Sequence, residues 1–341
     1  MKAYEYITSK QIQWALNRDI LLIGSKGDKG RPAYTPDLRA NLLEPLSSDI
    51  RESFEQGDGN EIKGNPAKMQ AVHSSSALGV NVFQYWQDIQ QVPVVASACG
   101  FCRKGNTVSE KIVFEDKYPI DDNLDKFPIA PNIDVVFHNT DSSQFKRFAV
   151  ECKFSEAYGS QKHNGLKPAY LELTQLWSDI PSLCGFAKSI CPNENFNYLH
   201  SAQLIKHILG LKRKFGKSGF RLLYLWYDVL GKEGAVHRDE IETFSGIAKA
   251  DGIYFDAMSY QELILTWILR RLFNGRKALL ENSHILGKMR PFKPIFNHFS
   301  TKINASRPNF EIFKKFSSGS CLHRLGEKGN RRLKWHVKIL R

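Results

Sequence analysis

Helix-like and strand-like hydrophobic patterns organise most of the chain. Residues 9–17 predict an N-terminal helix, and a polar connection that contains several glycines is expected over residues 49–67. Between residues 69 and 90 the apolar side chains approximate helical spacing, which is typical of an amphipathic helix. A break is expected over residues 93–106. The first half of the chain therefore predicts helices separated by loops.

Short apolar runs follow this break and predict strands. They lie at residues 111–114, 133–137 and 148–154, with turn residues between them. Three such strands after a helix favour an antiparallel meander packed against that helix.

The second half continues with a helix over residues 200–215 and a continuous apolar run at residues 221–227. That run is typical of a strand buried on both faces, and a last helix is expected over residues 259–273. The order of elements predicts an α/β or α+β fold with a central mixed sheet.

Length and composition exclude several classes of protein. The chain has 341 residues, of which 42% are hydrophobic and 24% charged, so it has ample material for a buried core. No apolar run approaches the length of a membrane span, and the N-terminus lacks the layout of a signal peptide. We therefore expect a cytoplasmic protein. The six cysteines are too few for a disulfide framework, and the Cys99/Cys102 pair alone is weak evidence for a metal site.

The positive charge is concentrated at the C-terminal end. Residues 271–341 hold 17 of the 48 Lys and Arg residues but only 3 of the 35 acidic ones, whereas the rest of the chain is close to neutral. Aromatic residues are interleaved with these basic ones, a pattern that suits phosphate neutralisation and base stacking. A solvated tail that only aids solubility is the alternative. The candidate nucleic-acid contacts are Lys314, Lys315, Arg331 and Arg332.

Acidic and basic residues interrupt two of the predicted strands. Because side chains alternate along a strand, Glu151 and Lys153 share one face of the 148–154 run. Asp134 interrupts the apolar run of the preceding strand. If the two strands are neighbours, Asp134 and Glu151 can chelate one divalent cation and Lys153 lies beside it. This set suits phosphodiester hydrolysis, although an internal ion pair between Asp134 and Lys153 is an alternative.

The surroundings of these residues match a known pattern. The segment FPIAPNID at residues 127–134, followed by VECKFSEAY at residues 150–158, resembles the PD-(D/E)xK nuclease superfamily. More narrowly it resembles a restriction-endonuclease-like bacterial family with a signature of the type PPNIDV…ESKFTEPY. The segment HSSSAL at residues 73–78 looks like the N-terminal helix motif of that family, and the resemblance covers roughly residues 55–270. It implies a restriction-endonuclease-like core of αβββαβ order.

The resemblance also implies roles for individual residues. Asp134 and Glu151 would be metal ligands, with Mg²⁺ as the cofactor or Mn²⁺ in its place, and Lys153 would position or activate the attacking water. A further Glu ligand, Glu61 or its rival Glu115, remains open. Residues expected only to support the site are Glu156, Gln203 and His73, each of which has an ordinary structural alternative, as has His207.

Two departures from the family pattern occur beside the predicted site. Cys152 stands where the family tends to have Ser, and Ala157 replaces the Pro expected before Tyr158. Cys152 faces away from the site, so the chemistry should survive.

The basic tail cannot be matched to the family. We expect an N-terminal region over residues 1–54, a nuclease domain over residues 55–273 and a basic extension over residues 274–341.

The resulting functional prediction is a Mg²⁺-dependent endodeoxyribonuclease of the restriction or genome-defence kind. The alternative is a catalytically silent nucleic-acid-binding module on the same fold, and the choice between DNA and RNA stays open. A homodimer is an expectation from the resemblance alone.

Overall fold

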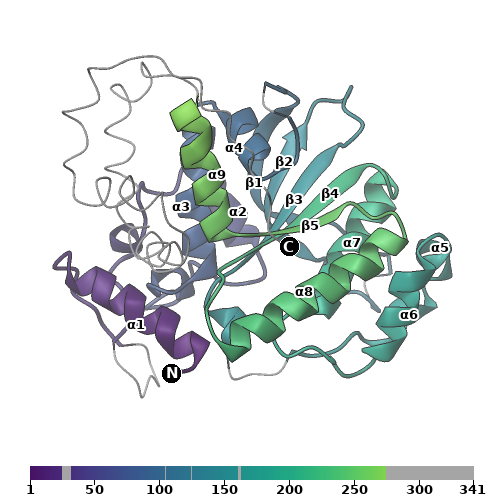
Figure 1. Cartoon of the computed structure of the whole chain (residues 1–341), viewed down its shortest axis with the longest axis horizontal. Coiled ribbons are helices and arrows are strands. Elements are labelled where there is room, and N and C mark those ends of the chain that lie inside the picture. Colours follow the sequence, from purple (N-terminus) through teal and green to yellow (C-terminus); the bar gives the residue numbers. More distant parts are fainter. Residues whose placement is uncertain (25–31, 104, 124, 160–162, 274–341) are drawn as a thin grey trace, which may run out of the picture. The chain divides into compact units, whose positions relative to one another are not determined.

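The computed structural model describes residues 1–24, 32–103, 105–123, 125–159 and 163–273. A five-stranded sheet lies at the centre of this part of the chain (Figure 1). In spatial order the strands are β1 (Ser109–Lys117), β2 (Asn132–Asn139), β3 (Arg147–Lys153), β4 (Phe220–Trp226) and β5 (Phe255–Ser259). A mixed sheet flanked by helices confirms the predicted α/β class.

Two kinds of pairing meet at the middle strand. β1, β2 and β3 pair antiparallel as the predicted meander, whereas β3–β4 and β4–β5 pair parallel. β4 is buried along almost its whole length, because it is the middle strand of the parallel part and helices cover the sheet on both sides. β3 therefore has an antiparallel neighbour on one side and a parallel neighbour on the other.

Helices cover both faces of the sheet (Figure 1). One face carries α3 (Ser75–Asp88), α4 (Val92–Ala98) and α9 (Tyr260–Phe273), and the other carries α7 (Ser201–Phe215) and α8 (Lys232–Ala250). The remaining helices are α1 (Ala3–Leu16), α2 (Ser48–Gln56), α5 (Thr174–Trp177) and α6 (Pro181–Ser189). Both α1 and α2 belong to a compact unit that spans Met1–Pro291.

Local sequence signals explain where the main helices begin and end. Ser74 caps α3 by accepting a hydrogen bond from the Ala77 N–H at 3.2 Å. Ser259 and Glu262 form a reciprocal capping box at the start of α9, with bonds of 2.8 and 3.1 Å. α7 is followed by Gly216, whose φ of +72° favours glycine. These devices fix the helices that border the sheet.

Aromatic packing holds α3 and the segment after α4 on β2 and β3. Phe83 meets Phe137 edge to face with ring centroids 5.9 Å apart, and Phe101 stacks on Phe148 at 4.7 Å. All four side chains are buried, and each such burial contributes about 1.5–3 kcal/mol. The packing fixes the two strands that carry Asp134 and Glu151.

Several elements differ from the sequence prediction. α2 covers part of the expected polar connection at residues 49–67, with Ile50 and Phe54 as its buried residues. α4 lies within the expected break. Pro93 does not prevent this helix, because it occupies the first turn, where a missing backbone N–H costs nothing. β5 was also not predicted; it has five residues, too few for a clear alternation.

α8 is the largest element that the prediction missed. Its buried side includes His237 and Glu240 as well as Ile241 and Phe244. Two polar residues on the buried stripe hide the hydrophobic period.

Some predicted features lie outside the described residues. The basic extension lies wholly there, and so do Lys314, Lys315, Arg331 and Arg332. A second unit, Phe292–Arg341, also lies there. Among the residues that the structure describes, no helix is long and apolar enough to cross a membrane.

Candidate active site

The candidate site lies where β2 and β3 stop pairing. The last antiparallel partners are Val135 and Val150. Asp134 is the residue next to Val135, and its Oδ2 accepts a hydrogen bond from the backbone N–H of Cys152 at 2.7 Å. A side-chain carboxylate thus replaces a backbone carbonyl of the neighbouring strand, and this contact fixes Asp134 beside Glu151.

The two faces of β3 differ as the alternation predicted. Cys152 faces α3, since a Cβ built on Gly79 of that helix would lie 3.6 Å from its Sγ. Glu151 points to the opposite face, where α7 provides His207. Cys152 therefore lies beneath the site and is not part of it.

Glu151 is the most enclosed charged group of the site. It is 0% exposed, and its carboxylate lies between two basic side chains. Lys153 Nζ is 2.6 Å from Oε1, and His207 Nε2 is 2.9 Å from Oε2. Burial opposes ionisation of Glu151, but Lys153 and His207 outweigh it and lower its pKa to about 2. Glu151 is therefore ionised at neutral pH.

Lys153 is a permanent cation in this arrangement. Burial alone would lower its pKa, but the carboxylates of Glu151 and Asp134 outweigh burial and raise the pKa above its usual value. Its side chain is 14% exposed, so one edge reaches the surface. Lys153 can attract a phosphate but is poorly suited to act as a base.

The site has more carboxyl groups than Lys153 alone can neutralise. Burial, and then the charge of Glu151, raise the pKa of Asp134 well above its usual value. Burial raises the pKa of Glu115 to about 7; the hydrogen bond from Asn132 opposes this shift, and the charges of Glu61 and Glu151 add to it. Carboxylates that repel one another in this way favour a bound cation.

Glu115 also has an unusual backbone. It lies within β1, opposite the Asp134 region of β2, and its φ is +52°. A non-glycine residue in the left-handed region costs of order 1–3 kcal/mol, and such strain concentrates at functional sites. Asn132 Nδ2 donates to Glu115 Oε2 at 3.1 Å and so holds the carboxylate in place.

Glu61, the other candidate for a further ligand, has its own partners. Ser76 Oγ donates to Glu61 Oε2 at 3.1 Å, and Lys68 Nζ lies 3.8 Å from Oε1. In the described part of the chain, no group of three or more His, Cys, Asp or Glu side chains is arranged to hold a metal ion. The choice between Glu61 and Glu115 thus stays a prediction.

The residues present nevertheless fit a magnesium ion. Mg²⁺ in nucleases and polymerases is commonly held by one or two carboxylates, with waters and substrate phosphate completing the shell. Asn132 Oδ1 is a buried oxygen that accepts no hydrogen bond within the described residues, and the buried Glu151 Oε1 has Lys153 Nζ as its partner at 2.6 Å. Two adjacent carboxylates, Asp134 and Glu151, would supply hard oxygen ligands to such an ion.

The three residues expected to support the site lie around it in different ways. Glu156 is exposed and accepts from the Phe154 N–H at 3.2 Å, at the end of β3. Gln203 lies one turn before His207 on the same face of α7. His73 packs edge to face with Tyr4 and Tyr34, and its backbone carbonyl accepts from Ser155 Oγ at 2.9 Å. His73 therefore joins the N-terminal region to the end of β3.

Sequence reasoning missed two histidines near Lys153. His163 and His200 stack with ring centroids 4.3 Å apart and an angle of 9° between the rings. Burial, the neighbouring His163 and the charge of Lys153 lower the pKa of His200 to about 3. This contact follows only from the three-dimensional structure, because the two residues lie far apart in the sequence.

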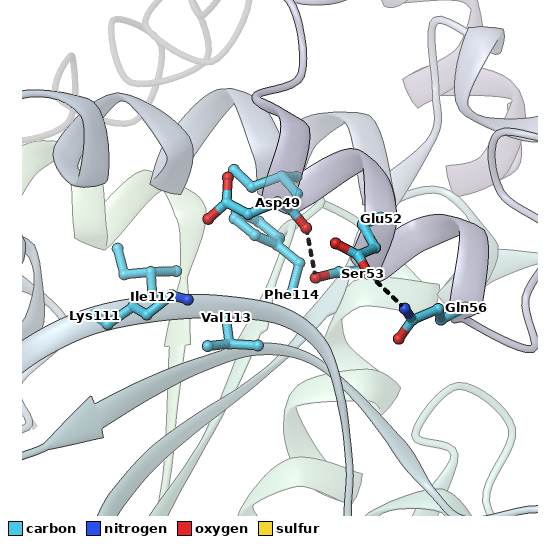
Figure 2. A pocket seen from close by; sticks show the side chains of 9 residues that line it. Asp49, Glu52, Ser53, Gln56, Lys111, Ile112, Val113 and Phe114 are labelled. Carbon is cyan, nitrogen blue, oxygen red and sulfur yellow. Dashed lines mark hydrogen bonds between the residues drawn. The ribbon is translucent and has the colours of Figure 1, made fainter.

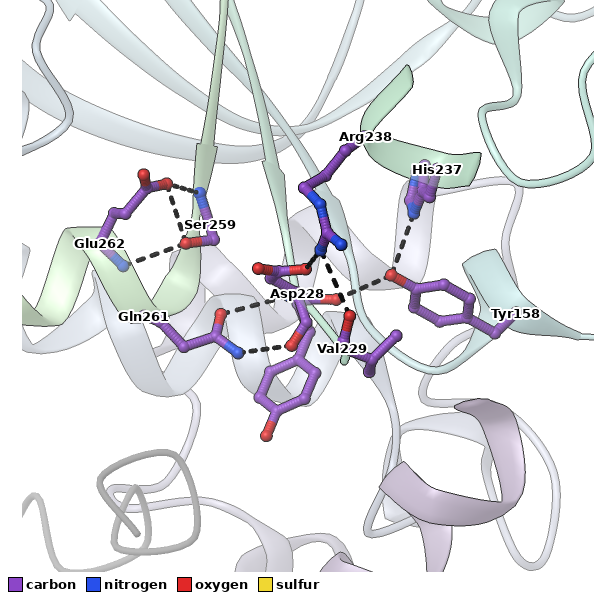
Figure 3. Close-up of polar contacts among 9 residues, drawn as sticks. Tyr158, Asp228, Val229, His237, Arg238, Ser259, Gln261 and Glu262 are labelled. Carbon is purple, nitrogen blue, oxygen red and sulfur yellow. Dashed lines mark hydrogen bonds and ion pairs between the residues drawn. The ribbon is translucent and has the colours of Figure 1, made fainter. Parts of the chain in front are cut away.

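A second polar cluster lies on the same face of the sheet, beneath α8. We call Tyr158, Tyr224 and His237 the α8 network; Figure 3 shows part of it. Tyr158 donates to the Tyr227 carbonyl at 3.1 Å, so it accepts from His237 Nδ1, also at 3.1 Å. His237 Nε2 then accepts from Tyr224, 3.0 Å away. Burial lowers the pKa of His237 to about 3, which keeps the ring neutral.

A pocket at the outer edge of the sheet lies apart from these groups. It measures about 190 Å³ and lies between α2 and β1 (Figure 2). None of the predicted catalytic residues lines it. Its lining includes Asp49, Glu52, Ser53, Gln56 and the β1 residues Lys111, Ile112, Val113 and Phe114.

Comparison with known proteins identifies one family. The model of the family described as Restriction Endonuclease associating with ARP matches residues 11–279, which is well over half of the chain. Comparisons with curated proteins and with solved structures yield no match.

Proposed function

We propose, because the chain belongs to the family described as Restriction Endonuclease associating with ARP, that it is a Mg²⁺-dependent endodeoxyribonuclease. The reaction is hydrolysis of a DNA phosphodiester bond, in restriction or genome defence. The observation that carries the proposal is the convergence of Asp134, Glu151 and Lys153 where β2 and β3 separate. These are the residue types that metal-dependent phosphodiester hydrolysis needs.

Asp134 and Glu151 would hold the metal in this proposal. A bound Mg²⁺ would make a water more acidic and neutralise charge that develops on the phosphate. Asp134 is suited to this role because its hydrogen bond to Cys152 uses Oδ2 and leaves Oδ1 available. Glu115 or Glu61 is the proposed further ligand or support.

Lys153 would act on the phosphate as a positive charge. Because the two carboxylates keep it protonated, it is suited to stabilise negative charge and to orient the attacking water through its N–H groups. Its partly exposed edge gives it access to a substrate at the surface.

Several finer features belong to the proposal as well. DNA is the proposed substrate because the family description names a restriction endonuclease, and the basic residues after position 270 would contact its backbone. The description also names an association with ARP, which we propose for this chain. A homodimer and a cytoplasmic location complete the proposal.

The enclosed charges argue against the silent binding module. A buried acidic pair that has no catalytic use costs folding free energy, and apolar residues of similar volume replace such groups without loss. The presence of Asp134, Glu151 and Lys153 together therefore favours an enzyme.

The test is the dependence of wild-type activity on metal and substrate. Purified full-length protein is incubated with methylated and unmethylated duplex DNA and with RNA, in Mg²⁺, Mn²⁺ or EDTA. The proposal predicts DNA cleavage with Mg²⁺ that leaves 5′-phosphate ends and stops in EDTA. Cleavage that persists in EDTA, or is confined to RNA, contradicts it.

A further inference from the structure

We propose that His207 is a positioning residue that fixes the Glu151 carboxylate for metal binding. This inference rests on the proposed function and deepens it. His207 does not touch the metal; it holds one oxygen of Glu151 so that the other is presented to the cation.

The contact joins two side chains that are both almost completely enclosed. His207 Nε2 lies 2.9 Å from Glu151 Oε2, and each side chain is 1% exposed. An ionised carboxylate can only accept hydrogen bonds, so His207 Nε2 must carry the hydrogen. Nδ1 is buried and forms no hydrogen bond with any described residue. Within the described residues, the only hydrogen bond of the His207 ring is therefore the one to Glu151.

The second oxygen of Glu151 is treated differently. Oε1 forms an ion pair with Lys153 Nζ, 2.6 Å away, and the Lys153 side chain is 14% exposed, whereas that of His207 is 1% exposed. The carboxylate is thus held at Oε2 from α7, whereas Oε1, which has two lone-pair sites, can bind a cation as well as Lys153. This asymmetry suits a monodentate metal ligand.

α7, the helix that carries His207, is held in place by packing and capping, so the backbone position of His207 is fixed. Its apolar side buries Leu204, Ile208 and Leu211, each at most 1% exposed. At its start, Ser201 Oγ and the Ala202 N–H donate to Glu194 at 2.8 and 3.1 Å. Packing and capping together fix the position of α7 relative to the sheet.

The segment before α7 is fixed as well. Glu240 of α8 accepts hydrogen bonds from the backbone N–H groups of Asn197, Tyr198 and Leu199, at 2.6, 2.9 and 2.9 Å. The α8 carboxylate therefore supports the helix that carries His207.

Loss of such an outer partner weakens metal binding without removing a ligand. Partners that orient a metal ligand typically account for 10–100-fold in metal affinity or activity, so we expect about that loss when the His207 contact is removed.

Two amide variants separate the contact from the presence of a polar side chain. In His207→Gln the amide nitrogen lies as many bonds from Cα as the imidazole Nε2, so it can still donate to Glu151. In His207→Asn the amide stops at the level of Nδ1 and cannot reach. Mn²⁺ binding is measured by electron paramagnetic resonance on each full-length protein, with thermal melting in EDTA as the folding control.

We expect His207→Asn to bind Mn²⁺ about 10–100-fold more weakly than wild type, and His207→Gln to remain close to wild type. Equal affinity in both variants and wild type overturns the inference, as does equal weakening in both. If wild type cleaves DNA but the variants do not differ in Mn²⁺ affinity, only the positioning role fails. If wild type neither binds Mn²⁺ nor cleaves, the proposed function fails as well.

A measurement on the wild-type protein keeps the inference testable if His207→Asn does not fold. Nitrogen-15 NMR of labelled histidine distinguishes the two ring tautomers. We expect the His207 proton on Nε2 and a shift of that resonance when Mg²⁺ is added. A proton on Nδ1 alone, or a resonance that ignores Mg²⁺, contradicts the role.

Discussion

His207 and His237 lie on the same face of the sheet, yet their surroundings differ. His207 on α7 faces the charges of Glu151 and Lys153, and one of its ring nitrogens has no partner among the described residues. His237 on α8 is 0% exposed, and tyrosine hydroxyls satisfy both of its nitrogens. The α8 network is neutral and saturated, whereas the site beneath α7 is charged and incompletely satisfied.

This difference separates groups that stabilise the fold from groups that serve chemistry. A buried polar network in which every group is satisfied rigidifies its surroundings. Buried carboxylates that repel one another store unfavourable energy unless a ligand relieves it. Changes beneath α7 should therefore affect activity more than stability, and changes in the α8 network should do the reverse.

The largest expected effect is the loss of activity in Asp134→Asn. The amide oxygen can still accept from the Cys152 N–H, and repulsion with Glu151 disappears. We predict a rate loss of about a thousandfold or more, because a bound metal supplies several kcal/mol of charge stabilisation. Initial rates and a thermal melt check this; a melting temperature well below wild type would instead indicate a structural role.

The mirror experiment is His237→Leu in the α8 network. It leaves the Tyr224 hydroxyl buried without an acceptor, which costs about 1–3 kcal/mol. Urea unfolding should show this loss, whereas the rate of cleavage per folded molecule stays unchanged. Adding Tyr224→Phe should recover part of the stability, because the orphaned hydroxyl is then removed. A double variant no more stable than His237→Leu argues against the network.

A pH experiment examines Glu115 on β1, whose pKa is raised by burial and by the charges of Glu61 and Glu151. The pKa of Glu115 is raised to about 7 in the folded state, above its value in the unfolded chain. Protonation of Glu115 therefore stabilises the folded state, and this stabilisation is lost as the pH rises. In EDTA, wild type should therefore lose stability relative to Glu115→Gln as the pH rises from about 4.5 to 7, by about 1–3 kcal/mol. Denaturant melts at several pH values measure the difference. A constant difference across this range contradicts the assigned shift.

The smallest expected effect is that of Cys152→Ala. Its thiol packs near Gly79 of α3 and so lies on the far side of β3 from Glu151. We predict unchanged cleavage and a stability loss of about 1 kcal/mol, typical of a buried truncation. Kinetics and urea unfolding check both. A large drop in rate at full stability means that the two faces of β3 are not independent.

The sequence predicted the parts of the site that depend on strand alternation. The placement of Glu151 and Lys153 opposite Cys152 follows from a period of two, and the apolar run around Asp134 marked the neighbouring strand.

Other parts follow only from three-dimensional packing. The positive φ of Glu115 and the contact of His207 with Glu151, 56 positions away in the chain, leave no periodic trace. α8 escaped prediction because its buried stripe contains His237 and Glu240. These two polar residues are buried and form hydrogen bonds inside the protein, so they are not part of its surface.

Cleavage of supercoiled plasmid by wild type and by Glu151→Gln, with and without Mg²⁺, tests the role of Glu151 most directly. Glu172→Gln is the matched control, since this exposed carboxylate pairs only with Lys126 in the described structure. We predict Mg²⁺-dependent nicking by wild type and the control, and none by a folded Glu151→Gln protein. Equal cleavage by Glu151→Gln and wild type would contradict the assignment of the site.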